Sequence, residues 1–252
     1  MKRQIPSAEL RRRAREIAAR AILRRAATLL GAARRSTHPL RLPYPVAGRG
    51  ELAVDETIEN VAARPGVPPR PEDLVVEIRE ERKLDAVLMV DTSLSMTGKN
   101  LALAGVAAAV LAWKLDPRDY SLVVFEGTAT VTKRLGVAMT KEDAIGRLLE
   151  VPAMGFTNIE DALKKGLDQL ERGRNRERLG ILITDGVYTE GDDPLPLASR
   201  FPRLYVLMTE AYKMDRALCQ KMADRGRGKL FSVDDYSELP FAVSALLGEV
   251  LR

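Results

Sequence analysis

Cysteine and histidine are nearly absent from this chain of 252 residues, because Cys219 and His38 are the only residues of their kinds. One cysteine cannot form a disulfide within the chain, so nothing here indicates an oxidising compartment. One cysteine and one histidine are also too few for a Cys/His zinc site. His38 lies in a proline-flanked stretch, where a Ser-His-Asp triad is not expected. Any metal bound by this chain therefore needs oxygen ligands.

Long apolar runs are also missing. The longest, residues 106–113, is far below the roughly 20 residues that a membrane span needs. Residues 1–4 lead into an arginine-rich stretch and not an apolar one, which does not match a secretory leader. We therefore expect a cytoplasmic protein that does not contact a membrane.

Two common phosphate-handling motifs are absent as well. The chain has no G-x-x-x-x-G-K-[ST] loop, since Gly98-Lys99-Asn100 lacks both the leading glycine spacing and the hydroxyl. A HAD-type phosphatase needs a second aspartate two residues after the first, and Ser93 holds that place after Asp91. We therefore expect no enzymatic turnover.

The net charge of +5 hides a strong asymmetry along the chain. Residues 1–50 contain thirteen Lys and Arg against Glu9 and Glu16, so they carry +11 and the remainder carries about −6. An arm of this kind can contact RNA or DNA, an acidic partner, or the acidic body of the same chain. Tyr44 is the only aromatic residue of these 50, so platforms for base stacking are missing. The clustered arginines are Arg11, Arg12, Arg13, Arg24, Arg25, Arg34 and Arg35.

Composition divides the chain into three segments. Residues 1–35 predict a basic helical arm, rich in Ala, Arg and Leu. Residues 36–79 are rich in proline, which forbids long helices, and predict an extended connector with an edge strand near 74–79. Residues 80–252 predict the main domain. The arm carries a modest apolar stripe of Leu10, Ile17, Ala21 and Leu29, with Ala14 and Ala18.

Strands and helices alternate at short intervals within residues 80–252. This alternation predicts an α/β fold of the Rossmann-like, doubly wound type, with a mostly parallel sheet and helices on both faces. Strands are expected at 84–90, 120–126, 129–133, 179–184, 204–208 and 229–233. Helices are expected at 99–115, 141–150, 159–172, 194–200, 215–225 and 237–251. The short connection before 129–133 makes that strand the antiparallel edge strand.

Oxygen-bearing side chains follow two of these strands and open one of the helices. Asp91, Ser93 and Ser95 come directly after the strand at 84–90, Asp185 follows the strand at 179–184, and Thr157 precedes the helix at 159–172. Because ligands bind beyond the carboxyl ends of strands in such sheets, these five residues are expected to form one site. A site of carboxylates and hydroxyls alone suits Mg²⁺ or Mn²⁺.

Each piece of this set also has a local explanation that needs no metal. Ser93 or Ser95 can cap the following helix, since serine is a favoured N-cap. Thr157 and Glu160 match a capping box, and Asp185-Gly186 is an ordinary turn at a strand end. The sequence alone leaves these alternatives open for each residue by itself. The metal site is favoured because all five residues are expected at positions that one metal ion could reach.

Asp-Thr-Ser-Leu-Ser at 91–95 resembles the D-x-S-x-S signature of von Willebrand factor A (VWA) domains and their metal-ion-dependent adhesion site (MIDAS). Thr157 and Asp185 match the threonine and the last aspartate of that site, and Phe156 departs from the family's usual glycine. The resemblance implies a VWA fold in which Ser93, Ser95 and Thr157 bind Mg²⁺ directly. Asp91 and Asp185 would act mainly through bound waters. Such a metal retains attraction for a carboxylate from a partner.

The flanking segments resemble VWA proteins of the magnesium-chelatase-D and CoxE kind. The residues that carry this likeness are 50–58, 73–76 and 83–87. Those proteins work with MoxR-type AAA+ ATPases, which implies such an ATPase as the partner. The predicted function is therefore a metal-dependent protein–protein interaction module, and the alternative is an RNA- or DNA-binding protein that uses the basic arm.

Overall fold

The computed structural model describes most of the chain in nine ranges. They are residues 8–32, 40–48, 51–78, 83–96, 98–151, 155–209, 214–233, 235 and 237–250. Two compact units are present, and each is described by itself. The larger contains the first helix and residues 83–250, and the smaller contains residues 35–82. Within the described ranges, none of the helices combines the length and apolar character that crossing a bilayer requires.

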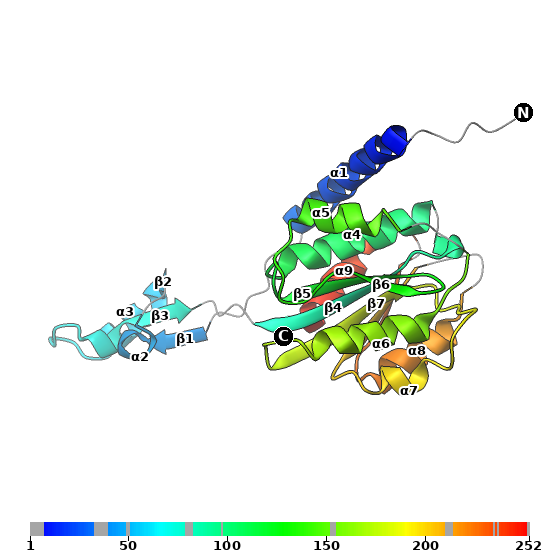
Figure 1. Cartoon of the computed structure of the whole chain (residues 1–252). Coiled ribbons are helices and arrows are strands. Elements are labelled where there is room, and N and C mark those ends of the chain that lie inside the picture. The colour runs from blue at the N-terminus through cyan, green and yellow to red at the C-terminus, as the bar shows by residue number, and fades with distance from the viewer. Residues whose placement is uncertain are drawn as a thin grey trace, which may run out of the picture. The chain divides into compact units, whose positions relative to one another are not determined.

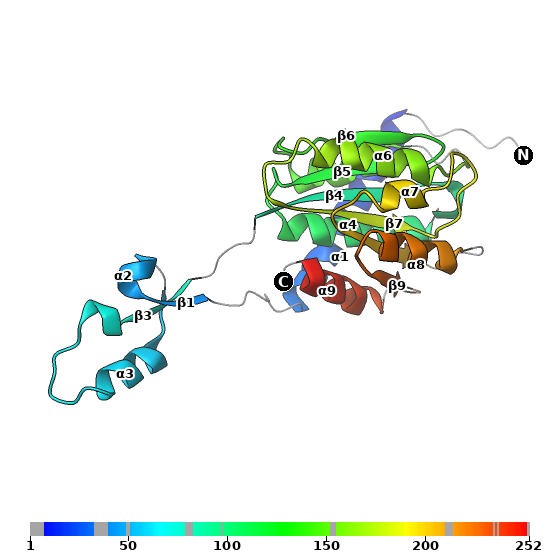
Figure 2. The same ribbon diagram turned by 90° about the horizontal axis from the view of Figure 1, so that it is seen from below.

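A six-stranded sheet forms the centre of the larger unit, in the order β6-β5-β4-β7-β8-β9. Figure 2 shows β6, β5, β4 and β7 side by side. Its strands are β4 (Leu84–Asp91), β5 (Tyr120–Phe125), β6 (Ala129–Lys133), β7 (Glu177–Thr184), β8 (Leu204–Thr209) and β9 (Leu230–Val233). All neighbours pair in parallel except β5 and β6, which are antiparallel. The predicted fold class and the antiparallel edge strand are both confirmed.

Strand β4 lies inside the sheet, between β5 and β7, and every one of its residues is buried. Its near-continuous apolar run is typical of a parallel strand covered by helices on both faces. In the pairing with β7, Val90 lies opposite Ile183, so the two strands end side by side. This register brings the loops that follow β4 and β7 to the same edge of the sheet.

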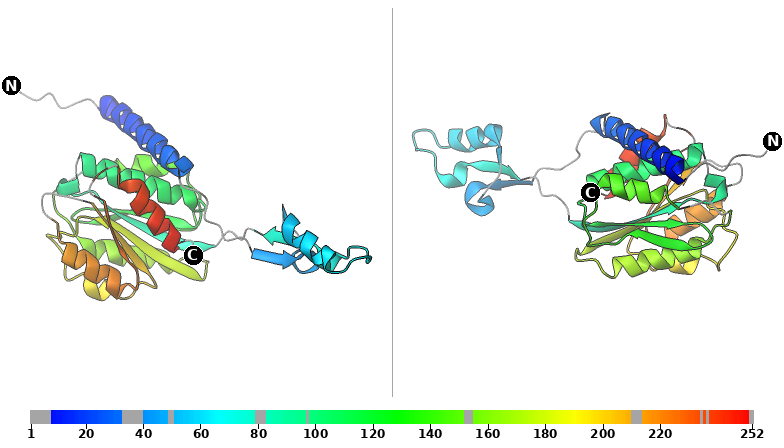
Figure 3. Two further views of the ribbon diagram at one scale, coloured as in Figure 1. Left: turned by 180° about the vertical axis from the view of Figure 1, so that it is seen from behind. Right: turned by 45° about the horizontal axis from the view of Figure 1, so that its top comes forward.

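Helices cover the two faces of the sheet (Figures 1 and 3). One face carries α4 (Lys99–Lys114), α5 (Lys141–Leu148) and α9 (Leu239–Val250). The other carries α6 (Ile159–Leu170), α7 (Leu195–Ala198) and α8 (Arg216–Arg225). On the second face, Phe201 and Met89 fill the space above Gly166 and Gly180 in the main apolar cluster.

The basic arm is the helix α1 (Ala8–Ala32), and it packs against α4 and α5. Its buried residues are Ala19, Ile22, Leu23 and Ala26, a spacing that marks one helix face. A β-carbon on Gly105 of α4 would lie only 3.0 Å from Ile22 Cδ1, so the glycine makes room for the isoleucine. The predicted stripe is displaced from the real one, because Ile17 is 68% exposed and Ala21 is exposed as well.

Ile22→Ala should lower the free energy of unfolding by about 2–3 kcal/mol, because it leaves a cavity between α1 and α4. The matched control is Ile17→Ala on the exposed face of the same helix, which should change it by less than about 0.5 kcal/mol. Urea denaturation of both variants measures the difference. Equal effects from the two substitutions would contradict the docking of α1 by this face.

The smaller unit corrects the prediction of an extended connector over 36–79. It contains a three-stranded antiparallel sheet in the order β1-β3-β2, together with short helices. Its elements are β1 (Leu40–Pro43), α2 (Tyr44–Ala47), β2 (Glu51–Leu52), α3 (Val54–Ala62), η1 (Pro71–Asp73) and β3 (Val75–Ile78). The strand expected at an edge, β3, is central, because β1 and β2 pair with it from both sides. Prolines forbid long helices, yet Pro45 and Pro71 stand at helix starts, where proline is tolerated.

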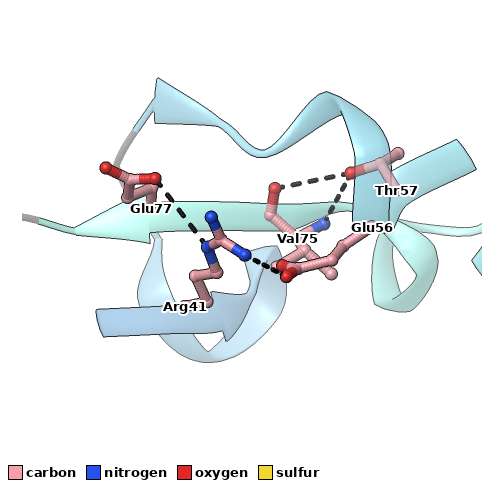
Figure 4. A network of polar contacts seen from close by, with 5 residues as sticks. All are labelled: Arg41, Glu56, Thr57, Val75 and Glu77. Atoms are coloured by element: carbon pink, nitrogen blue, oxygen red, sulfur yellow. Dashed lines mark hydrogen bonds and ion pairs between the residues drawn. The ribbon is translucent and has the colours of Figure 1, made fainter. Parts of the chain in front are cut away.

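Polar contacts join α3 to this small sheet (Figure 4). Thr57 Oγ1 accepts a hydrogen bond from Val75 N at 3.0 Å and lies 3.4 Å from Val75 O, to which it donates. Arg41 on β1 pairs with Glu56 of α3 and lies 3.8 Å from Glu77 of β3. These contacts hold together a unit with little apolar core of its own.

Candidate metal centre

Three loops meet at the carboxyl ends of the parallel strands. Thr92, just after β4, donates from its backbone N to Phe125 O at the end of β5, at 2.9 Å. Asn158, just before α6, donates from its backbone N to Glu126 O at 2.7 Å. The end of β5 therefore lies between the loop after β4 and the loop before α6. This arrangement brings the loop of Asp91, Ser93 and Ser95 close to the loop that contains Thr157.

Asp91 is fully buried at the end of β4, and both of its carboxylate oxygens have partners. Oδ1 accepts a hydrogen bond from Ser93 N at 2.9 Å, and Oδ2 accepts one from Thr184 Oγ1 on β7 at 2.7 Å. The hydroxyl oxygens of Ser93 and Ser95 lie 3.1 Å apart. Ser93 is buried and Ser95 is exposed, so this pair of hydroxyls leads from the buried carboxylate to solvent.

The pKa of Asp91 is raised to about 6, chiefly by burial and to a smaller extent by the nearby charge of Asp185. The hydrogen bonds from Thr184 and Ser93 oppose this shift but do not cancel it. A buried carboxylate beside a second one is stabilised in its charged form by a cation close to both. The electrostatics of this strand end therefore favour a bound metal ion.

Asp185 has the clearest unsatisfied atom in the described part of the site. Its Oδ1 accepts a hydrogen bond from Val187 N at 2.9 Å, as in a local turn. Its Oδ2 is buried and has no hydrogen-bond partner. A buried carboxylate oxygen without a partner carries a substantial desolvation cost, which a cation or its bound water would relieve. The turn explains one oxygen of Asp185 and leaves the other for a ligand.

Thr157 is buried at 4% exposure in the loop before α6. Its backbone is fixed by Thr189, whose Oγ1 accepts from Thr157 N at 3.0 Å and whose N donates to Thr157 O at 2.9 Å. The cap of α6 is Asn158, whose side chain accepts from Asp161 N. The structure therefore rules out the alternative in which Thr157 and Glu160 form a capping box, and the threonine is not needed as a cap.

The serines also do not cap α4, because that helix begins at Lys99 and its N-cap is Gly98. They flank Leu94 in the loop, where Leu94–Met96 form the short 3-10 helix η2. The described residues contain no cluster of three or more His, Cys, Asp or Glu side chains that could hold a metal. A metal here would depend on hydroxyls beside two carboxylates, and these oxygen donors fit Mg²⁺ or Mn²⁺.

Two supporting residues escaped the sequence-based set. Thr184 orients Asp91, and its position directly before Asp185 in Ile-Thr-Asp-Gly was a usable signal. Thr189 fixes Thr157 from 32 residues away, and no local pattern reveals such a contact. Both are hydroxyl residues that hold a predicted site residue in place.

The clustered arginines that the structure describes belong to α1, which packs on α4 and α5. Arg13 is exposed and pairs with Glu9 at 2.8 Å, and Arg24 and Arg25 are exposed on α1. For Arg11 and Arg12 only the helical backbone is described. Arg34, Arg35 and His38 lie outside the described residues.

Comparison with known proteins identifies the domain. Residues 85–245 match the family model of the von Willebrand factor type A domain. The chain belongs to the VWA family. A curated relative, inter-alpha-trypsin inhibitor heavy chain H4 of Sus scrofa, is 32% identical over 117 residues, which cover 43% of this chain. The matched part is only 13% of that relative's length, and the same holds for the human protein.

Solved structures share the fold of this VWA chain at low sequence identity. BatB from Bacteroides thetaiotaomicron has a TM-score of 0.56 at 19% identity, covering 66% of this chain and 98% of that one. Proximal thread matrix protein 1 from the mussel byssus, with a zinc-occupied MIDAS motif, has a TM-score of 0.54 at 19% identity. That match covers 68% of this chain and 48% of the mussel chain. These likenesses extend the family assignment to the fold.

Gly186 follows Asp185 with a φ of +83°, and a β-carbon there would lie 2.5 Å from Cys219 Sγ and 2.6 Å from Asp215 O. Gly186→Ala should therefore lower the free energy of unfolding by about 3 kcal/mol, through backbone strain and overpacking together. Gly136→Ala is the matched control, since Gly136 has a φ of +81° and open space around it. It should cost only the strain, about 1 kcal/mol. Equal losses in chemical denaturation would show that the packing under Asp185 is not tight.

Proposed function

We propose that this protein is a metal-dependent protein–protein interaction module. Mg²⁺, or Mn²⁺ in its place, would be held by Asp91, Ser93, Ser95, Thr157 and Asp185. The partnerless Oδ2 of Asp185, buried at the same strand edge as the fully buried Asp91, carries this proposal. VWA domains are often metal-dependent interaction modules, which agrees with it.

The donor set favours binding over catalysis. Neutral hydroxyls from Ser93, Ser95 and Thr157 would leave much of the metal's charge available. When bound, the metal would supply a positive centre that attracts a carboxylate from a partner. Asp91 and Asp185 are held by Thr184, Ser93 and Val187 and are therefore positioned to orient ligands. We propose that the chain has no turnover of its own.

The proposed partner is a MoxR-type AAA+ ATPase. Its support is the likeness of residues 50–58, 73–76 and 83–87 to the flanks of magnesium-chelatase-D and CoxE-like proteins. The first two segments fall in the smaller unit, which folds around β3. Such a unit gives the chain a second folded surface in addition to the metal loops of the larger unit.

Asp91→Asn should weaken Mg²⁺ and Mn²⁺ binding at least tenfold, because it removes the charge and keeps the shape. The matched control is Asp116→Asn, since Asp116 lies before β5 at the opposite edge of the sheet and accepts a backbone hydrogen bond from Arg118. That variant should bind metal like the wild type. Titration calorimetry with each metal alone gives the affinities. Unchanged affinity of the Asp91→Asn protein would overturn the site.

Binding to the ATPase should require the metal and Thr157. We expect a purified MoxR-type AAA+ ATPase encoded by the same genome to be captured in Mg²⁺ and released by EDTA. Thr157→Ala should weaken capture, and Thr157→Ser, which keeps the hydroxyl, should retain it. Capture that persists in EDTA and in Thr157→Ala would refute the metal-bridged contact.

A charge-reversal variant separates this function from nucleic-acid binding. Arg24→Glu with Arg25→Glu changes the exposed face of α1 and spares its buried residues. If the protein acted on RNA or DNA, this double variant would abolish binding, and salt would do the same to the wild type. Asp91→Asn would then have no effect. Removal of α1 is not suitable, since it would uncover the apolar surface on α4.

A further inference from the structure

Four large apolar side chains that lie next to residues of the candidate metal centre in the chain face solvent. Leu94 is 60% exposed, Phe156 53%, Met214 47% and Tyr188 38%. Apolar side chains scattered one by one over a surface need no explanation, but a gathering of them at one place marks an interaction site. These four belong to loops that follow β4, β7 and β8 and to the loop before α6.

Each of the four is within two residues of a group that forms or fixes the site. Leu94 stands between Ser93 and Ser95, whose hydroxyls lie 3.1 Å apart. Phe156 precedes Thr157, and its Cβ would lie 3.2 Å from a β-carbon placed on Gly127. The loop before α6 is thereby held against the turn after β5.

The remaining two are fixed by the loops around Asp185. Tyr188 stands between Val187, which donates to Asp185 Oδ1, and Thr189, which holds Thr157. Met214 precedes Asp215, whose backbone N donates to Asp185 O at 3.0 Å. The apolar side chains are therefore anchored around the same pair of buried carboxylates.

The four apolar side chains form what we call the apolar rim. Negative charge beside this rim restricts the kind of segment that can bind. Glu190, Asp192 and Asp193 are exposed in the loop that continues from Tyr188. Glu160 Oε2 accepts a hydrogen bond from Asp192 N at 3.0 Å, which ties this loop to α6. A partner segment with several acidic residues would be repelled here, since like charges disfavour close approach.

We infer that the site takes one carboxylate set between large apolar side chains, such as a Glu flanked by Leu, Met or aromatic residues on an exposed partner segment. This inference rests on the proposed function and names the partner's chemistry. The metal would hold the carboxylate while Leu94, Phe156, Tyr188 and Met214 cover its apolar neighbours. A polyacidic stretch lacks the apolar neighbours and meets the acidic loop. A lone carboxylate gains nothing from the rim.

The test is a selection from a displayed library of random heptapeptides with a fixed central glutamate. The full chain is immobilised in Mg²⁺, and bound peptides are eluted with EDTA and sequenced. We expect Leu, Met, Phe or Trp beside the glutamate to be enriched at least fivefold, and additional Asp and Glu to be depleted. The double variant Leu94→Ser with Phe156→Ser should lose this enrichment while its Mg²⁺ affinity in calorimetry stays within twofold.

Val137→Ser is the matched control, since Val137 is 51% exposed but lies beside Gly136, which bonds to Arg118 before β5. It should select the same peptides as the wild type. An EDTA-eluted pool with polar or acidic flanks, or an unaltered pool from the double variant, would overturn the apolar rim and leave the metal-bridged function standing. No EDTA-eluted pool from the wild type would refute the proposed function and this inference with it.

Discussion

The burial of two carboxylates at the ends of adjacent parallel strands is the constraint around which the site is arranged. The register that sets Val90 opposite Ile183 places Thr184 beside Asp91, and the threonine hydroxyl holds one carboxylate oxygen at 2.7 Å. Asp185 then falls one residue beyond β7, where its Oδ2 stays buried without a partner. Two such charges cost free energy unless something positive lies between them. The loops that carry Ser93, Ser95 and Thr157 bring neutral oxygens to the same place.

The main fold was predictable because its signals are local. A parallel strand buried on both faces shows as an apolar run, and residues just past such a strand must lie at the sheet's carboxyl edge. That reasoning placed Asp91 and Asp185 correctly at the ends of β4 and β7. The role of Thr157 was harder to assign, since a capping box explained it equally well. Only the observed cap at Asn158 removes that alternative.

Contacts between distant segments account for what the sequence did not show. The smaller unit forms because Leu40–Pro43 pairs with Val75–Ile78. No short-range pattern in a proline-rich stretch predicts that pairing. The docked face of α1 was misplaced for a related reason. An Ala-rich helix has a shallow contrast between its faces, so the stripe through Ile17 looked as apolar as the true one through Ile22. The face with Ile22 is the one that packs closely on Gly105 of α4, and Gly105 lies far along the chain from α1.

The docking of α1 also changes the meaning of the basic charge. With Ala19, Ile22 and Ala26 against the body, Arg24 and Arg25 are directed to solvent on the outer face of a packed helix. The positive charge is then part of the folded surface. Charges of this kind act over roughly 8 Å at physiological salt, which suits attraction and orientation of a partner. A carboxylate held at the strand ends would be recognised at bonding distance and with fixed geometry. If α1 steers a partner and the metal loops select its carboxylate, the two effects would be separable, because they would act over different ranges and respond differently to salt.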